Sequence, residues 1–144
     1  MTDWNKIAAH IQNLTGQACQ PRAIQELGGG CINRAFVLRD GQSAWFVKIN
    51  DAQRLAMFQA EAAGLKALTA AKALRVPTPL GAGLAGAEAF LVLEYLAFGR
   101  PRRDGGAEAG RRLAHLHRQS QARFGWDRDN FIGSTPQPNA EAQD

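Results

Sequence analysis

The stretch LGGGCINRAFVLRDGQSAWFVKIN, residues 27–50, decides the fold. Three consecutive glycines precede a short apolar segment, the pair Asp40-Gly41, and a second apolar segment that contains one lysine, Lys48. An Asp-Gly pair between two apolar segments predicts a two-residue β-hairpin. The stretch therefore predicts antiparallel strands, with a glycine-rich loop at one end and a lysine on the second strand.

Lys48 is unusual because of its neighbours on the predicted strand. Successive side chains of a strand point to opposite faces, so Lys48 shares a face with Phe46, while Trp45, Val47 and Ile49 point the other way. An ammonium group beneath a sheet is costly unless it meets an anion. The alternative is an edge strand, from which the lysine reaches water. The spacing alone does not separate these two interpretations.

Glu61 supplies a candidate anion. A helix is predicted over about residues 53–73, before Pro77 and Pro79, and Glu61 lies within its apolar stripe. That stripe contains Leu55, Phe58, Ala62, Leu65 and Leu68. A Lys–Glu pair beside a glycine-rich hairpin is the arrangement with which kinases hold the α- and β-phosphates of ATP. The alternative is an edge position at which Glu61 reaches water.

The glycines themselves fit no common nucleotide fingerprint. They lie at a hairpin, and the sequence contains no G-x-x-x-x-G-K-[ST] motif, so a Walker loop and a dinucleotide motif are both excluded. A hairpin without side chains can bring its backbone N–H groups close to phosphates. A merely flexible turn is the alternative.

The remaining chain predicts an α+β fold. Apolar residues at helical spacing over 3–14 predict a helix that ends at Gly16, and residues 89–96 form an almost continuous apolar run, typical of a strand buried on both faces. Further strands are predicted at 22–27, 33–39 and 43–50, a linker at 97–106, a helix at 107–120 and an irregular tail from 121. We therefore expect an antiparallel sheet of about five strands, one crossing helix and an N-terminal helix, followed by the first helix of a second unit.

Composition narrows the class of protein. The 144 residues are 45% hydrophobic, with a net charge of +4 and only two cysteines. No apolar run approaches the roughly 18 residues of a membrane span, and the N-terminus lacks the pattern of a signal peptide. The arginines at 100–112 have no interleaved aromatic residues for base stacking, so they indicate a solvated or anion-attracting surface. We expect a cytoplasmic protein without a nucleic-acid or membrane partner.

Several segments together resemble one family. In order and spacing, the segments ELGGGCINRAFVL, FVKIN, F-x-A-E-A-x-G-L-x-x-L, VPTPLGAG, FLVLEYL, LAHLHR and FGWDRDNFIGSTPQPN are similar to the fructosamine kinase (ketosamine-3-kinase) family. That family is a branch of the protein-kinase-like fold related to aminoglycoside and choline kinases. The resemblance covers essentially the whole chain, and its last segment is the most specific. It implies a nucleotide-binding small lobe over 1–96, and a hinge with the start of the helical large lobe over 97–144.

The resemblance implies that ATP, with Mg²⁺, is the cofactor, and it gives roles to particular residues. Lys48 would contact the α- and β-phosphates and would be oriented by Glu61. The nucleotide-covering loop would comprise Gly28, Gly29, Gly30, Cys31, Ile32 and Asn33. The hinge that binds adenine through backbone groups would comprise Glu94, Tyr95, Leu96 and Ala97. Cys31 is linked in the family to redox-dependent dimerisation through a disulfide; the alternative is a small residue that fills space.

The implied reaction is ATP-dependent phosphorylation of the 3-hydroxyl of a ketoamine, a sugar attached to a lysine amine. The phosphorylated adduct then decomposes, so a glycated protein is deglycated. Candidate substrate residues are Trp126, Asp127, Asp129 and Asn130, for which cross-bracing of the large lobe is the alternative.

The sequence departs from the family pattern at one point. No H-G-D-L-x-x-x-N segment occurs, nor the D-P-A segment that supplies the main Mg²⁺ ligand. We expect the catalytic Asp and the metal ligands after Asp144, no metal ligands or catalytic residue within this chain, and no catalysis by the 144 residues alone. The alternatives are a catalytically dead nucleotide-binding or interaction module and, disfavoured by the S-T-P-Q-P-N segment, an aminoglycoside or choline kinase-like phosphotransferase.

Overall fold

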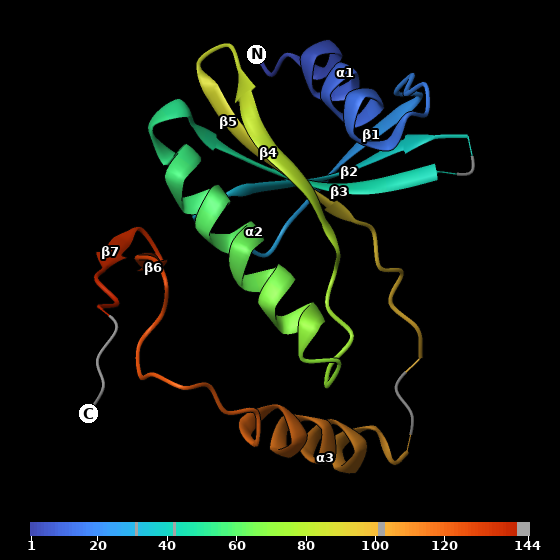
Figure 1. Cartoon of the computed structure of the whole chain (residues 1–144). Helices are drawn as coiled ribbons and strands as arrows, with labels where there is room; N and C mark the ends of the chain where they lie inside the picture. The colour runs from blue at the N-terminus through green and yellow to red at the C-terminus, as the bar shows by residue number, and fades with distance from the viewer. Residues whose placement is uncertain (31, 42, 101–102, 141–144) are drawn as a thin grey trace.

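The computed structural model describes residues 1–30, 32–41, 43–100 and 103–140 (Figure 1). The chain order is α1 (Trp4–Thr15), β1 (Ala23–Leu27), β2 (Arg34–Asp40), β3 (Ser43–Asp51), the 3-10 turn η1 (Ala52–Arg54), α2 (Leu55–Ala70), β4 (Pro79–Ala85), β5 (Glu88–Glu94), α3 (Gly105–His117), β6 (Asn130–Ile132) and β7 (Thr135–Gln137).

Five of these strands form one antiparallel sheet in the order β1-β2-β3-β5-β4. Helix α2 connects β3 to β4, so the chain leaves the middle of the sheet, crosses one face and returns at the edge. The α+β architecture predicted from the sequence, with five antiparallel strands, a crossing helix and an N-terminal helix, is confirmed.

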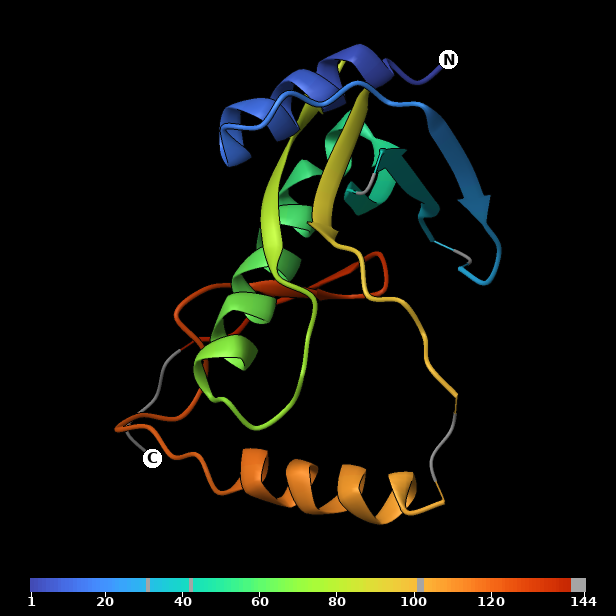
Figure 2. The same cartoon turned by 90° about the vertical axis from the view of Figure 1, so that its right-hand side faces the viewer.

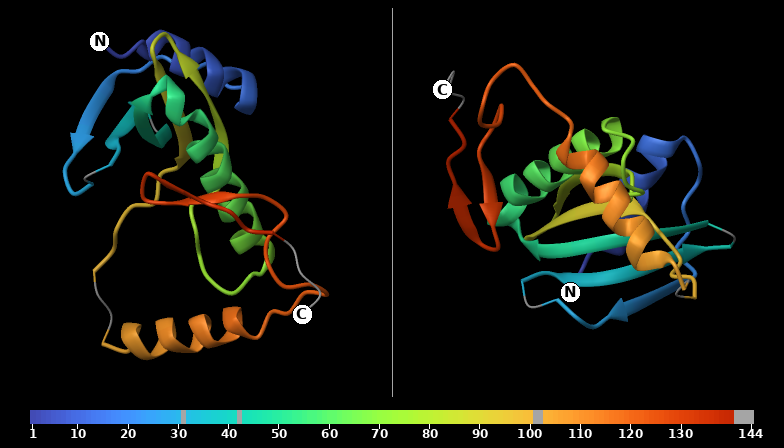
Figure 3. Two further views of the ribbon diagram at one scale, coloured as in Figure 1. Left: turned by 90° about the vertical axis from the view of Figure 1, so that its left-hand side faces the viewer. Right: turned by 90° about the horizontal axis from the view of Figure 1, so that it is seen from below.

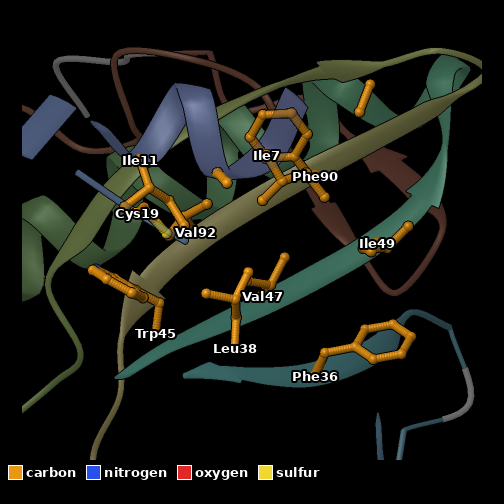
Figure 4. Close-up of a cluster of buried hydrophobic side chains, with 12 residues drawn as sticks. Ile7, Ile11, Cys19, Phe36, Leu38, Trp45, Val47, Ile49, Phe90 and Val92 are labelled. Atoms are coloured by element: carbon orange, nitrogen blue, oxygen red, sulfur yellow. The ribbon is translucent and has the colours of Figure 1, made fainter. Parts of the chain in front are cut away.

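Helix α1 covers one face of the sheet. Trp45, Val47 and Ile49 of β3 point to this face, as their alternation predicts, and Val47 is completely buried. The apolar cluster on this side is shown in Figure 4 and consists of Ile7, Ala8, Ile11, Cys19, Phe36, Leu38, Trp45, Val47, Ile49, Ala85, Phe90 and Val92. Burial of this much apolar surface is the main force that holds α1 on the sheet.

Helix α1 also has well-formed ends. The Asp3 carboxylate accepts a hydrogen bond from the Lys6 backbone N–H at 3.1 Å, which satisfies one of the free donors at the helix start. Gly16 ends the helix with a φ of +70°, a left-handed conformation that favours glycine. The helix start and the stop at Gly16 agree with the sequence prediction.

Helix α2 crosses the opposite face. The cluster on this side consists of Met57, Phe58, Ala89, Leu91 and Leu93, with Phe46, Leu55, Ala62, Leu65, Ala82 and Phe131 packed against it. The helix begins with η1 and ends at Ala70, three residues before the predicted end. The nearby residue Lys72 has a φ of +53°, which is incompatible with a continuing helix.

The structure corrects two boundaries. The predicted turn at Asp40-Gly41 is shifted, because Asp40 still belongs to β2 and pairs with Ser43. Gly41 follows the strand and has a φ of +56°. The Asp40 carboxylate accepts a hydrogen bond from the Gln20 backbone N–H at 2.8 Å, which holds this residue at the end of β2. Strand β5 ends at Glu94, although the apolar run extends to residue 96.

The tail was predicted to be irregular, and this was wrong for residues 130–137. Strands β6 and β7 form a hairpin in which Ile132 pairs with Thr135, and Gly133 has a φ of +63°. Phe131 packs against the α2 cluster, so this β6–β7 hairpin lies beside α2, as Figure 3 shows from two sides.

Helix α3 stands apart from the sheet. The chain leaves β5, runs away from it and forms α3 below the lower end of α2 (Figure 2). No residue of α3 is buried, and Leu113 on this helix is 46% exposed. The helix predicted over 107–120 is thus present at 105–117, and of its apolar residues Leu113 is exposed while Leu116 is half-buried beside a hollow shared with α2.

Candidate functional site

Lys48 and Glu61 form an ion pair. The Lys48 Nζ lies 2.8 Å from Oε1 and 2.6 Å from Oε2 of Glu61, and the two side chains are 22% and 31% exposed. Lys48 pairs with Ala35 of β2 on one side and with Leu91 of β5 on the other. Because β3 is therefore an inner strand, the edge-strand interpretation of Lys48 is wrong.

The ion pair lines a cavity of about 340 Å³. Its walls come from four places: the end of the glycine-rich loop, strand β3, helix α2 and the β6–β7 hairpin. The lining residues are Ile32, Asn33, Lys48, Met57, Ala60, Glu61, Gly64, Asn130, Phe131 and Gly133. The cavity combines one ammonium, one carboxylate and two side-chain amides with an apolar wall, which is the composition expected of a small-molecule site.

Of the described residues of the glycine-rich loop, those at its end line this cavity. Gly28, Gly29 and Gly30 are exposed, and Gly29 has a φ of +113°, a conformation that residues with a side chain rarely adopt. Ile32 and Asn33 line the cavity. Cys31, the predicted redox residue, lies outside the described residues, so the prediction of a disulfide-linked dimer stays a prediction.

Asn50 fastens the loop to the sheet, and the sequence analysis missed it. Its Nδ2 donates to the carbonyl oxygen of Ile32 at 3.0 Å and to Oδ1 of Asn33 at 2.7 Å. Its Oδ1 accepts a hydrogen bond from the Asp51 backbone N–H at 2.8 Å. The sequence could have pointed to Asn50 through strand alternation, because Asn50 lies two residues after Lys48 and therefore on the same face of β3.

The predicted hinge follows β5 directly. Glu94 is structural: its carboxylate accepts hydrogen bonds from Arg75 and from Thr78, and the bond from Arg75 is the main reason that the Glu94 pKa lies below its ordinary value. The guanidinium of Arg39 lies over the ring of Tyr95, with 5.0 Å between the Arg39 Cζ and the ring centroid.

Beyond Tyr95 the backbone has unused hydrogen-bonding groups. Leu96 is half-buried and Ala97 is exposed, and neither makes a backbone hydrogen bond to another residue in the described ranges. Their N–H and C=O groups are therefore available to a ligand, and β5, which leads to them, runs beside the strand that carries Lys48.

The four candidate substrate residues are not all in one place. Asn130 lines the cavity of Lys48, while Trp126 and Asp127 line a neighbouring hollow of about 340 Å³ against α2. Asp127 accepts hydrogen bonds from Arg128, which hold its pKa below the ordinary value. Asp129 accepts a hydrogen bond from the Asn139 backbone N–H at 2.9 Å. Of these four residues, only Asn130 lines the same cavity as the Lys48–Glu61 ion pair.

A sequence model of the family described as fructosamine kinase matches residues 3–144. The chain belongs to the fructosamine kinase family. This agrees with the resemblance seen in its motifs and with the kinase-like small lobe of the structure.

Curated relatives and solved structures agree with this assignment. A protein of Synechocystis sp. named "Probable ketoamine kinase" is 46% identical over 137 residues, which cover 94% of this chain and 46% of the relative. A chloroplastic protein-ribulosamine 3-kinase of Arabidopsis thaliana is 40% identical, over 90% of this chain and 40% of the relative. A crystal structure from Haemophilus somnus, of a protein named as a candidate fructosamine-3-kinase, matches with a TM-score of 0.89 and 28% identity over 97% of this chain and 48% of that one.

The chain thus spans less than half the length of the curated relatives and of the solved structure just described. Within the described residues, no group of three or more His, Cys, Asp or Glu side chains is placed to hold a metal ion. None of the helices in the described ranges has the length and apolar character needed to cross a membrane.

Proposed function

We propose that this chain is the ATP-binding part of a ketoamine 3-kinase, a phosphotransferase with an alcohol group as acceptor. The observation that carries the proposal is the Lys48–Glu61 ion pair, 2.6 Å long at its shorter contact, in a cavity whose upper wall is the end of a glycine-rich loop. An ammonium that is oriented by two bonds to a carboxylate offers its third N–H group to phosphate oxygens. The family membership of the chain supports the same chemistry.

The residues divide into three groups in this proposal. The loop of residues 28–33 covers the triphosphate, and Lys48, held by Glu61, contacts the α- and β-phosphates. The backbone of residues 94–97 binds the adenine, a role supported by the unused backbone groups of Leu96 and Ala97. Phosphoryl transfer depends mainly on positioning and on charge stabilisation, so these contacts are a necessary half of the machinery.

The acceptor is the 3-hydroxyl of a ketoamine, either free or on a protein lysine, and its phosphorylation leads to deglycation. The printed names of the relatives, ketoamine kinase and protein-ribulosamine 3-kinase, support this substrate class. Trp126 and Asp127 belong in the proposal to the acceptor side, since their hollow adjoins the cavity of Lys48 along α2, and Asp129 joins them because it lines a second hollow together with both.

The catalytic aspartate and the Mg²⁺ ligands belong, in this proposal, to residues beyond Asp144. The donor groups described in this chain fit the phosphates of ATP, whereas no described cluster fits a metal ion. The 144 residues alone are therefore expected to bind ATP without transferring its phosphoryl group. The plant relatives are named as chloroplastic, so the cytoplasmic location expected from the sequence stays a prediction.

The proposal is tested by calorimetric titration of ATP into the 144-residue chain and into Lys48→Met. We expect the substitution to weaken ATP binding by at least about tenfold, because a charge-assisted contact to phosphate is lost. Lys66→Met is the matched control, because Lys66 is an exposed lysine of α2 that does not line the cavity. Equal ATP affinities of the two variants would contradict the proposal.

The reaction is tested on the native product that contains this chain, purified from its own cells and characterised by its intact mass. Incubation with ATP and a fructosyl- or ribulosyl-lysine should give a product with one phosphoryl group on the 3-hydroxyl, identified by NMR. A native product that binds ATP but leaves every ketoamine unchanged would favour the dead nucleotide-binding module instead.

A further inference from the structure

Two asparagine side chains from different elements line the cavity of Lys48. Asn33 ends the glycine-rich loop, and Asn130 begins β6 in the β6–β7 hairpin. An amide side chain can present either a donor or an acceptor to a ligand, and which one it presents depends on its other hydrogen bonds. The structure fixes this choice for both residues.

The orientation of Asn33 is set by Asn50. The Nδ2 of Asn50 also donates to the backbone carbonyl oxygen of Ile32, and the Oδ1 of Asn50 accepts from the backbone N–H of Asp51. A carbonyl oxygen can only accept and a backbone N–H can only donate, so the Asn50 amide cannot be turned around. The atom of Asn33 that faces the Nδ2 of Asn50 at 2.7 Å must therefore be its oxygen.

The same arrangement recurs at Asn130, where Asn139 takes the place of Asn50. The Nδ2 of Asn139 donates to the backbone carbonyl oxygen of Arg128 at 3.3 Å and to Oδ1 of Asn130 at 2.8 Å. The contact with the carbonyl oxygen again fixes the direction, so the amide oxygen of Asn130 is occupied as an acceptor. Neither Asn50 nor Asn139 lines the cavity.

The NH₂ groups are what remains on both cavity residues. Over the ranges that the structure describes, the Nδ2 atoms of Asn33 and Asn130 have no hydrogen-bond partner. The Glu61 carboxylate is engaged by both of its oxygens with Lys48. The side-chain groups of this cavity without a described partner are therefore donors: the third N–H of Lys48 and the two amide NH₂ groups, while both Glu61 oxygens already accept from Lys48.

A cavity whose unpartnered side-chain groups are donors fits a ligand rich in acceptor oxygens. A phosphoryl group has only acceptors and can use all three donors, whereas a sugar hydroxyl also brings a proton, for which the cavity offers only the Glu61 oxygens that already accept from Lys48. We infer that Asn33 and Asn130 bind the phosphoryl oxygens of the nucleotide from different elements of the cavity, with Asn50 and Asn139 as positioning residues. Asn130 thus binds phosphate rather than sugar.

The hairpin contributes to this site because it is fastened to the small lobe. Phe131 packs against the α2 cluster, and the Arg54 guanidinium donates to the carbonyl oxygen of Ser134 at 3.2 Å. A methyl group at Gly133 would lie 3.3 Å from Cδ1 of Ile32, so the hairpin and the end of the loop are close together. The β6–β7 hairpin is therefore part of the nucleotide site.

The inference rests on the proposed function for its ligand, and titrations with ATP and with adenosine test both separately. Asn130→Asp keeps the oxygen that Asn139 binds but replaces the NH₂ by a second carboxylate oxygen. We expect ATP affinity to fall about tenfold or more, since a donor to an anion is lost and a negative charge is added. Adenosine affinity should stay within about twofold, because adenosine has no phosphate.

Gln59→Glu is the control, because it adds the same charge to an exposed position of α2 outside the cavity. Asn33→Asp is a second variant, at the end of the glycine-rich loop, which keeps the test valid if Asn130→Asp disturbs the hairpin. Circular dichroism checks the folding of each variant. Asn139→Ala should weaken ATP binding less than Asn130→Asp, since it removes only the orientation of the amide.

The outcomes are distinct. If Lys48→Met loses ATP affinity while Asn130→Asp and Asn33→Asp behave like Gln59→Glu, the inference is wrong and the proposed function stands. If the unaltered chain binds ATP no better than adenosine, the cavity holds no phosphate and both are wrong. Equal loss of ATP and adenosine affinity in the asparagine variants would indicate a general structural effect and would also overturn the inference.

Discussion

The two faces of the sheet are built from the same strands but have different contents. On β3, Trp45, Val47 and Ile49 point toward α1 into an apolar cluster, while Phe46, Lys48 and Asn50 point toward α2. The first set is buried; of the second set, Lys48 lines the cavity and Asn50 donates a hydrogen bond to Asn33, which also lines it. A strand period of two therefore separates the residues that stabilise the domain from those that form its site.

This difference explains how a central strand can carry a charged residue. The α1 face supplies apolar burial for which no ligand is required. The α2 face can then leave a half-buried ion pair open to a cavity without loss of the fold. Substitutions on the α1 face should change stability, and substitutions on the α2 face should change binding.

The largest effect is expected from Phe90→Ala on the α1 face. Phe90 is 1% exposed, and truncation of a buried phenylalanine costs about 3–5 kcal/mol in the free energy of unfolding. The measurement is chemical denaturation followed by circular dichroism. Phe131→Ala, the matched change at a half-buried position of the α2 side, should cost less than half as much. Equal costs would contradict the separation of the two faces.

The second effect concerns glycines. A methyl group at Gly83 would lie 2.9 Å from Cζ of the buried Phe90 ring, so Gly83→Ala should lower the free energy of unfolding by about 1–3 kcal/mol. A methyl group at Gly64 on α2 would meet nothing within 4 Å, and Gly64→Ala should raise helix stability by up to about 1 kcal/mol. The same denaturation measurement compares them. Changes of the same sign in the free energy of unfolding for the two variants would contradict the difference between the two faces.

The third effect concerns binding rather than stability. Glu61→Gln removes the charge that orients Lys48, and we expect ATP affinity to fall about tenfold, or about 1.4 kcal/mol. The free energy of unfolding should change by less than about 1 kcal/mol, because the ion pair is partly exposed to solvent. A variant that unfolds more easily but binds ATP normally would show that Glu61 has a structural role only.

The smallest effect is a pH dependence on the α1 face. Burial lowers the pKa of His10 below its ordinary value of 6.5, and its Nε2 has no hydrogen-bond partner among the residues that the structure describes. As the pH falls, the unfolded chain takes up a proton on His10 more readily than the folded chain does. The contribution of His10 to the stability of the fold is therefore complete above pH 6.5 and decreases progressively as the pH falls through and below this value.

The test compares unfolding at about pH 7.5 and about pH 5.5, on either side of the ordinary histidine value. His10→Gln should lose stability less steeply over this interval than the unaltered chain. His117→Gln, a change at an exposed histidine of α3, should keep the full dependence. An unchanged slope in His10→Gln would show that another group titrates.

The sequence predicts the sheet and the ion pair well, because both follow from periodicity. The alternation around Lys48 and the helical spacing around Glu61 place the two side chains on facing surfaces before any coordinates are known. Neither pattern shows which strand is internal, since strand order depends on long-range pairing, so the edge-strand alternative for Lys48 stayed open.

The hairpin of residues 130–137 was missed for a different reason. Its strands are three residues long, too short for a visible alternation, and Pro136 argues against a strand. The pair Gly133-Ser134 between Ile132 and Thr135 was the available signal for a two-residue turn. Strand alternation places Asn50 on the face of Lys48, but it does not show which residues Asn50 and Asn139 orient, because a hydrogen bond between residues distant in sequence follows no spacing rule.

The central claim is that the cavity of Lys48 and Glu61 holds the phosphates of ATP. A crystal structure of the chain with a non-hydrolysable ATP analogue tests it most directly. We expect phosphate oxygens at about 2.7–2.9 Å from the Lys48 Nζ, the usual length of a charge-assisted hydrogen bond, and the adenine beside residues 94–97. A well-ordered analogue bound elsewhere, with the cavity left to solvent, would contradict the claim.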